Sequence, residues 1–270
     1  MREIPLGQAT EYAGEYAPDL LYSVARSDAR SVAGIGPTLP FTGTDIWNAW
    51  ELTWLDPGGK PVVATATIRV DAASPNIIES KSLKLYLNSF AMTRFESVEE
   101  VAAVATSDLS ATAGSDVVVT VTEAAGWADG PASDFPGICI DDAAIGPVPT
   151  TVDAGSLVCD SGEDANEELY SHLLRSNCPV THQPDMGSVL VRYRGPKINR
   201  VSLLRYIVSY RQHNDFHEAC VERMFVDIKK HCSPEALTVY ARYNRRGGLD
   251  INPFRTDSGD AAENVRLWRQ

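Results

Sequence analysis

The chain has 270 residues, of which 44% are hydrophobic and 22% are charged, and its formal net charge is −12 at pH 7. This is the composition of an ordinary globular protein, long enough for one or two domains that bury a core without disulfide or metal support. The charge is uneven, because residues 1–150 hold 8 basic and 20 acidic side chains whereas residues 151–270 hold 16 of each. A general nucleic-acid binder needs a basic face toward the phosphates, so we expect no nucleic-acid partner.

The first residues, Met-Arg-Glu-Ile-Pro-Leu-Gly, lack the apolar core of a secretion signal. No uncharged apolar run approaches the roughly 20 residues that span a bilayer. The sequence therefore predicts a cytoplasmic protein with no membrane partner. Reduced thiols are expected, because the cysteines are odd in number and form no C-x-x-C pair. They are Cys139, Cys159, Cys178, Cys220 and Cys232.

The first half of the chain predicts an arm followed by a folded repeat. Residues 1–46 mix Gly, Pro, Ser and Thr with short apolar pieces and are predicted to be an irregular N-terminal arm. Residues 47–126 are predicted to form the first repeat, because alternating strand patterns flank an Asp-Pro-Gly-Gly turn and precede helical patterns. The expected elements are strands at 47–55 and 61–70, helices at about 81–92 and 97–109, and a strand at 117–122.

The second half predicts the same order of elements after a linker. Residues 127–166 are rich in Pro, Gly and Asp and are predicted to be a linker, and residues 167–270 are predicted to be the second repeat. Its expected elements are strands near 168–176 and 188–193, helices near 200–212 and 215–231, and strands at 236–243 and near 264–269. Residues 78–90 and 198–210 also share the pattern I-x3-S-L-x2-Y-x2-S-[FY] at an offset of 120, which favours an internal duplication.

The densest polar segment contains Cys178, His182 and Asp185 within eight residues, bracketed by two prolines. Prolines restrict the backbone, so this spacing allows a nucleophile and a proton donor to converge. A surface loop with a half-buried cysteine is the commoner explanation for such a segment.

Three further clusters have both structural and functional interpretations. Asp215 followed by Glu218 resembles a capping box, which would account for both acids without any function. Glu79 lies at the start of the equivalent helix of the first repeat, where a carboxylate suits the helix dipole. The arginines of the Arg245–Gly248 segment suit phosphate contact or a plain turn. The same choice between a phosphorylated ligand and a solvated face applies to two basic groups, Arg192/Arg194/Lys197/Arg200 and Arg242/Arg245/Arg246.

Two chemical hypotheses follow from these residues alone. In the first, Cys178 is a nucleophile with Asp185 as its acid partner, and two carboxylates, those of Glu79 and Glu218, hold a polar heterocycle. In the second, hydrolytic zinc is bound by Cys178, His182, His217 and Cys220. The zinc hypothesis is weaker, because no C-x2-C pair anchors the site. Rossmann and P-loop nucleotide motifs are absent from the sequence.

Four segments resemble, in the same order, the sequence blocks of the NADPH-dependent 7-cyano-7-deazaguanine reductases, the nitrile reductases of queuosine biosynthesis and tRNA modification. Residues 78–86 carry the signature E-S-K-S-x-K-x-Y, and the other blocks are residues 176–185, 216–218 and 245–254. The resemblance runs from about Trp47 to the C-terminus and is to the long, two-repeat form. It implies an α+β fold of two tandem tunnelling-fold (T-fold) domains, each an antiparallel sheet with two helices on one face, and a homodimer.

The resemblance also implies roles for individual residues. Cys178 would add to the nitrile of 7-cyano-7-deazaguanine as a covalent thioimide, and Asp185 would donate the proton. Two NADPH molecules would then reduce the adduct to 7-aminomethyl-7-deazaguanine, with no metal. The substrate would be bound by Ile78, Glu79, Ser80, His217 and Glu218, and NADPH by Ser80, Lys81, Arg246 and Gly247.

Two other functions remain alternatives at this point. One is a zinc-dependent GTP or pterin cyclohydrolase on a related fold, and the other is a catalytically silent purine-binding module. A further hypothesis is that Cys220, two residues beyond Glu218, lies near Cys178 and forms a protective, reversible disulfide with it.

Overall fold

The computed structural model describes residues 13–123, 133–147 and 149–270. The chain forms two compact units, and neither is a continuous stretch of sequence. Unit 1 comprises Met1–Ser27, Asp45–Gly130 and Arg245–Ile251, and unit 2 comprises Asp28–Thr44, Pro131–Asn244 and Asn252–Gln270. These units therefore do not follow the order of the segments predicted from the sequence.

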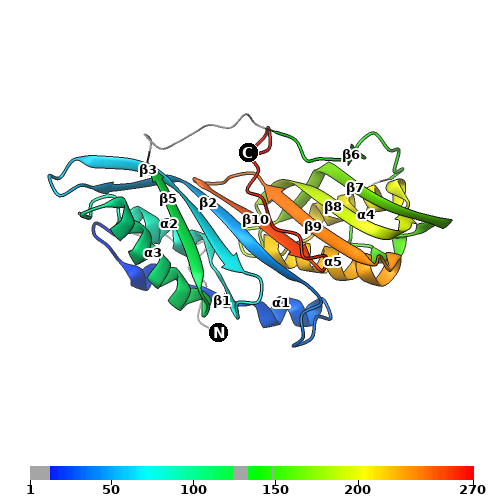
Figure 1. The fold of residues 1–270 in the computed structure, drawn as a ribbon, viewed down its shortest axis with the longest axis horizontal. Coiled ribbons are helices and arrows are strands. Elements are labelled where there is room, and N and C mark those ends of the chain that lie inside the picture. The colour runs from blue at the N-terminus through cyan, green and yellow to red at the C-terminus, as the bar shows by residue number, and fades with distance from the viewer. Residues whose placement is uncertain (1–12, 124–132, 148) are drawn as a thin grey trace. The chain divides into compact units, whose positions relative to one another are not determined.

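Unit 1 is an antiparallel sheet with a helix pair on one face (Figure 1). Its sheet has the strand order β5-β3-β2, and the first residues of β10 belong to the same unit. The alternation of apolar and polar residues in β3 buries every second side chain in the core of the unit. The elements are η1 (Pro18–Leu20), β1 (Ser23–Ala25), β2 (Thr42–Leu55), β3 (Pro61–Asp71), β4 (Asn76–Ile78), α2 (Ser80–Ser89), α3 (Val98–Ala113) and β5 (Val117–Glu123).

Unit 2 has the strand order β10-β9-β8-β7-β6, and α4 and α5 lie along one face of this sheet (Figure 1). The neighbouring pairs β10–β9, β9–β8 and β8–β7 are antiparallel, whereas β6 pairs with β7 in parallel. The α+β class is thus confirmed for both units. The elements are α1 (Arg26–Val32), β6 (Ile138–Cys139), η3 (Ala154–Ser156), β7 (Cys159–Asn177), β8 (Pro184–Ile198), α4 (Arg200–Val208), η4 (Ser209–Gln212), α5 (His217–Cys232), β9 (Ala236–Tyr243) and β10 (Leu249–Thr256).

The repeated sequence pattern makes the same contacts in both units. Ser82 Oγ donates to the Glu79 carbonyl at 2.7 Å and accepts from the Tyr22 N–H at 3.0 Å. Ser202 Oγ likewise donates to the Asn199 carbonyl at 2.8 Å and accepts from the Val158 N–H at 3.2 Å. The order strand, strand, helix, helix, strand is also confirmed in each unit.

A second pair of serines extends this equivalence to the chain that precedes each unit's sheet. The N–H of Ala17 donates to Ser89 Oγ, and the N–H of Asp153 donates to Ser209 Oγ. A 3-10 turn follows at once in both places, at η1 and at η3. Residues 17–22 and 153–158 are therefore structural counterparts, at an offset of 136.

Three expectations about local structure are wrong in the described residues. The predicted arm contains α1, β1 and the start of β2, although residues 1–12 lie outside the described residues. The predicted linker contains β6, η3 and the start of β7, with residues 127–132 and 148 again outside. The predicted strand near 264–269 is absent, and β10 is the last strand instead. Side-chain bonds hold this tail, because Arg242 donates to Asn264 and Tyr240 donates to the Glu263 carbonyl.

Candidate active site

Cys178 opens the turn between β7 and β8, where Asn177 and Pro184 form the last strand pair. The Cys178 N–H donates to the Gln183 carbonyl at 2.9 Å, and the Cys178 carbonyl accepts from the His182 N–H at 3.0 Å. His182 closes this tight turn with a positive φ of 56°. Cys178 is only 6% exposed, so the turn holds the residue almost entirely away from solvent.

Asp185 lies opposite Ser176 in the β7–β8 register, and residues directly opposite share a face of the sheet. Its Oδ2 is 3.2 Å from His217 Nε2, and the residue is 9% exposed. His217 is the first residue of α5. The structure therefore brings Asp185 and His217 together beside the turn that carries Cys178.

Backbone hydrogen bonds tie the segment before α5 to the end of β7. The Asn177 N–H donates to the His213 carbonyl at 2.8 Å, and the Asp215 N–H donates to the Asn177 carbonyl at 3.1 Å. As a result, α5 begins at His217 with Phe216 as its N-cap and no side-chain cap. The capping box predicted for Asp215 and Glu218 is wrong, because Asp215 is held in the ladder to β7. Glu218 is a buried carboxylate (3% exposed) in the first turn of α5, where the helix dipole favours it.

The zinc hypothesis finds no support in this geometry. His182 Nδ1 pairs with Asn214 Oδ1 at 3.1 Å, and His217 Nε2 faces Asp185. Among the described residues, no three His, Cys, Asp or Glu side chains form a group that could hold a metal ion. Cys178 and Cys220 are both free thiols, and burial raises the pKa of the Cys220 thiol well above its usual range.

Unit 1 carries the other predicted group of site residues at the start of α2. Ile78 ends β4, and the Glu79 carboxylate is the N-cap of α2, since it accepts from the N–H groups of Lys81 at 2.9 Å and Ser82 at 2.7 Å. Glu79 is buried and Ser80 is the first helical residue. The predicted position of Glu79 at a helix N-terminus is confirmed, and a carboxylate that accepts two bonds retains lone pairs for a ligand.

The turn between β9 and β10 is the second part of the unit 1 group. Gly247 and Gly248 adopt positive φ angles of 59° and 77°, which only glycine takes without strain. A Cβ built on Gly247 would stand 2.9 Å from Lys84 Nζ, so the ammonium group lies against this turn. The Arg245 guanidinium lies over the Trp50 ring at 5.0 Å. Two cationic side chains therefore lie at the turn, as an anionic ligand requires, although the Glu51 carboxylate lies against Gly248 on the same turn.

The other arginines considered from the sequence are engaged elsewhere. Arg242 is buried and donates to the side chains of Gln270, Tyr240 and Asn264, so it does not join a phosphate site. The basic group on and after β8 is paired with carboxylates, which favours the solvated-face interpretation. The pairs are Arg192 with Glu168 and Asp260, Arg194 with Glu235, Lys197 with Glu163, and Arg200 with Glu167.

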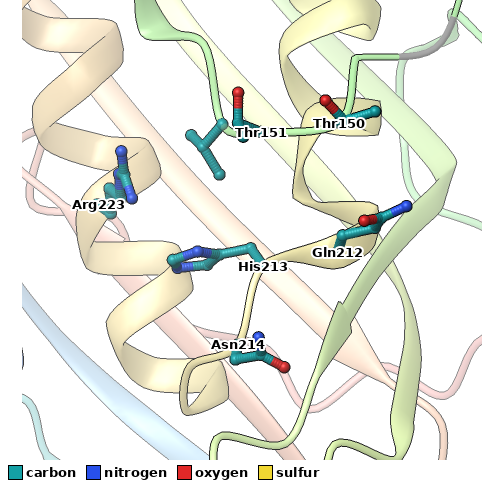
Figure 2. Close-up of a pocket in the computed structure, with 7 residues that line it drawn as sticks. Thr150, Thr151, Gln212, His213, Asn214 and Arg223 are labelled. Carbon is teal, nitrogen blue, oxygen red and sulfur yellow. The ribbon is translucent and has the colours of Figure 1, made fainter.

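A pocket of about 370 Å³ lies in unit 2 (Figure 2), and it holds none of the predicted site residues. By the same offset of 136, Val152 is the counterpart of Tyr16. Tyr16 packs its ring on Phe90 at 5.8 Å and donates to Asp108 at 2.7 Å, whereas the smaller Val152 lines the pocket. The lining residues are Thr150, Thr151, Val152, Gln212, His213, Asn214 and Arg223.

Sequence reasoning missed three residues that shape these groups: Lys84, Gly187 and Tyr243. Lys84 stands three residues after Lys81, a helical spacing that was visible in the sequence. Gly187 falls inside β8, and a glycine within a strand signals a close approach by another group. The ring of Tyr243 stacks on His217, and no sequence signal joins those two positions.

Two family models match the chain, "Nitrile reductase, 7-cyano-7-deazaguanine-reductase N-term" over residues 12–121 and "QueF-like protein" over residues 184–262. A curated relative from Dechloromonas aromatica (strain RCB), named NADPH-dependent 7-cyano-7-deazaguanine reductase, is 53% identical over 98% of this chain and 95% of the relative. A protein of the same name from Azoarcus sp. (strain BH72) is 52% identical over 95% of this chain and 91% of the relative. The solved structure of the archaeosine synthase QueF-Like in the apo form covers 38% of this chain and 100% of its own, at 19% identity and a TM-score of 0.32.

Proposed function

The chain belongs to the NADPH-dependent 7-cyano-7-deazaguanine reductases, a family of oxidoreductases, and we propose that it reduces the nitrile of 7-cyano-7-deazaguanine to the primary amine for queuosine biosynthesis. The observation that carries the proposal is the buried Asp185–His217 pair beside the Cys178 turn. A nucleophilic thiol next to a carboxylate that can move a proton is what addition to a nitrile needs.

In the first step, Cys178 Sγ attacks the nitrile carbon and one C≡N π bond is lost. The thiol proton ends on the nitrile nitrogen, so thiol plus nitrile gives a thioimide and no other reactant is consumed. Asp185 accepts this proton from the thiol and passes it to the nitrogen. His217 Nε2–H donates to the Asp185 carboxylate and keeps it oriented while it takes the proton from the thiol and gives it to the nitrogen.

The tautomer of His217 supports this assignment. In the described part of the chain, its Nδ1 is buried and makes no hydrogen bond. A proton on Nδ1 would be a buried unpaired donor, which costs about 1–3 kcal/mol. The proton therefore belongs on Nε2, where the Asp185 carboxylate accepts it.

The substrate's ring N–H groups suit carboxylate acceptors. Glu218 and His217 are the proposed substrate contacts of unit 2, and Ile78, Glu79 and Ser80 are those of unit 1. Adjacent N–H donors of a guanine-like edge can be accepted as a bidentate pair. Both Glu79 and Glu218 are buried, which strengthens such bonds.

NADPH supplies the hydride for each of the two reductions. We assign its binding to Ser80, Lys81, Arg246 and Gly247, and the fit is supported by the Lys84 ammonium against the Gly247 turn. A phosphate at the Gly247 turn would meet the Lys84 ammonium, and the guanidinium of Arg246 suits the phosphate oxygens. A site that excludes water would protect the half-reduced imine from hydrolysis between the two reductions.

Each unit is proposed to be a T-fold domain, and the protein is proposed to be a cytoplasmic homodimer. The order strand, strand, helix, helix, strand with both helices on one face supports the T-fold assignment. No helix within the described ranges is both long and apolar enough to cross a membrane. Sedimentation analysis of the purified chain tests the dimer.

The decisive experiment compares the wild type with Cys178→Ala. We expect the wild type to oxidise two NADPH per nitrile and, without NADPH, to show one covalent adduct by intact mass, whereas Cys178→Ala does neither. Cys139→Ala is the matched control, since Cys139 is exposed, and it should behave as the wild type. A wild type that forms no adduct and oxidises no NADPH, or whose activity needs zinc, would refute the proposal.

A further inference from the structure

We propose that Tyr243 is a positioning residue that holds the His217 ring on Asp185, and that Gly187 provides the room in which Tyr243 does so. The inference rests on the proposed function for its catalytic meaning, because it concerns how the proton-carrying pair is kept in line. Neither Tyr243 nor Gly187 contacts the reacting atoms in this scheme.

The His217 and Tyr243 rings are stacked face to face. Their centroids are 3.6 Å apart and their planes differ by 4°. In the same arrangement His217 Nε2 is 3.2 Å from Asp185 Oδ2. The stack fixes the plane of the imidazole, because a partial rotation about Cβ–Cγ would tilt the ring out of it, and the contact with Asp185 selects the flip of the ring that places Nε2 at the carboxylate.

The backbone of Tyr243 is held by strand pairing and by side-chain hydrogen bonds to its N–H and its carbonyl. It is the last residue of β9, it is fully buried, and it pairs with Gly187 across the β8–β9 ladder. Its N–H donates to Asn252 Oδ1 at 3.1 Å, and its carbonyl accepts from Gln270 Nε2 at 2.8 Å. The backbone that carries the ring is therefore held at both its N–H and its carbonyl, and the buried ring is packed against the strand that contains Gly187.

The absence of a side chain at Gly187 leaves room for the Tyr243 ring. A Cβ built there would stand 3.0 Å from Tyr243 Cδ1 and 3.1 Å from the Arg242 carbonyl oxygen, closer than most real Cβ contacts. Gly187 is two residues beyond Asp185 on β8, and residues two apart in a strand share a face. One face of β8 thus carries Asp185 and, two residues further on, the space at Gly187. The Tyr243 ring that stacks on His217 fills that space.

The flat ring, rather than the hydroxyl, carries the proposed role. The Tyr243 hydroxyl lies in a buried region with Cys220, Ser176 and Asp185 among its neighbours, whereas the ring is the part on which the imidazole stacks. His217 Nδ1 has no hydrogen bond in the described residues that could fix the ring by another route. We therefore expect Tyr243→Phe to preserve the alignment and Tyr243→Leu to lose it.

The test joins a spectroscopic readout to a kinetic one. Side-chain ¹⁵N signals of His217 should report a single Nε2–H tautomer in the wild type and Tyr243→Phe, and averaged tautomers in Tyr243→Leu. The rate of adduct formation without NADPH should fall about 10- to 100-fold in Tyr243→Leu, because a misplacement of about 1 Å costs that order in a positioned reaction. The rate in Tyr243→Phe should remain within about 3-fold of the wild type, because phenylalanine keeps the flat ring and therefore the alignment of the imidazole.

Gly187→Ala is the second variant if Tyr243→Leu does not fold, because its added methyl group would crowd the Tyr243 ring in the same stack. Its backbone needs no positive φ, so alanine should be accommodated by displacing the Tyr243 ring. Folded Tyr243→Leu or Gly187→Ala with wild-type His217 signals and an unchanged adduct rate would overturn the inference. If the wild type itself forms no adduct, the proposed function fails, whereas the His217 signals still decide whether Tyr243 orients the ring.

Discussion

Replacing Glu79 by asparagine separates two roles that this carboxylate is proposed to have. Glu79 caps α2 through the N–H groups of Lys81 and Ser82, and it is also assigned to the substrate. Unit 2 offers a natural control, because Asn199 stands at the equivalent position and caps α4 with a single bond from the Ser202 N–H at 3.0 Å. Glu79→Asn therefore copies into unit 1 a cap that the same protein already uses.

The expected sizes follow from the bonds that each change removes. Glu79→Ala leaves both amides without their carboxylate, and loss of an N-cap costs about 0.5–2 kcal/mol of unfolding free energy. Glu79→Asn restores one of the two bonds, so it should lie within about 1 kcal/mol of the wild type. Substrate affinity should fall in both variants by about 10- to 100-fold, because a hydrogen bond to a charged group contributes about 1.5–3 kcal/mol.

Urea unfolding followed by far-UV circular dichroism measures the first quantity, and titration of the nitrile onto each variant measures the second. Both are needed on the same preparations, so that affinity is compared only among folded proteins. Wild-type affinity in Glu79→Asn would show that Glu79 is a cap alone. Equal destabilisation of the two variants would refute the capping argument.

Three further outcomes follow from buried groups elsewhere in the chain. The Glu222 carboxylate accepts four N–H bonds, two from Arg30 and two from Arg255. Glu222→Gln should therefore lower the unfolding free energy by about 3–5 kcal/mol in urea titrations, and a loss below about 1 kcal/mol would contradict this. Burial and Asp108 raise the pKa of Tyr16 to about 12 from 10.0, so its stabilising effect is complete below pH 10 and is lost as pH rises toward 12; melting temperatures of the wild type and Tyr16→Phe should converge over that interval. Because burial raises the pKa of Cys220, its thiol should resist iodoacetamide at pH 8 until urea is added, and Cys220→Ser should not change thiol loss on oxidation; a disulfide-linked Cys220 peptide by mass spectrometry would show otherwise.

Periodicity predicted the elements whose cores are local and missed those that depend on distant partners. The strand at 61–70 alternates apolar and polar residues, and β3 spans Pro61–Asp71. By contrast, β10 buries Asp250 and Arg255, whose partners include residues far along the chain, Asn48 and Glu222. A segment so rich in buried polar groups has no strand pattern, whereas residues 264–269 alternate like a strand but are held by side-chain bonds.

The candidate site divides in the same way. The short spacing of Cys178 and Asp185 was enough to predict that one turn joins them, since a hairpin brings such residues together. The capping box at Asp215 was wrong because its N–H is committed to Asn177, a bond that no local pattern reveals. The stack of Tyr243 on His217 joins residues 26 positions apart on different elements, so only the folded chain places them in contact.

The division of β2 and β10 between the units has a consequence for synthesis on the ribosome. Unit 1 needs Arg245–Ile251, although the rest of it is complete by Gly130, and unit 2 needs Asp28–Thr44 from near the start of the chain. The sheet of unit 1 therefore gains its last segment only when the last tenth of the polypeptide has emerged, although Leu249 is the one residue of that segment in the buried core described for the unit. A nascent chain stalled before residue 245 should consequently be more sensitive to protease in unit 1 than the full chain.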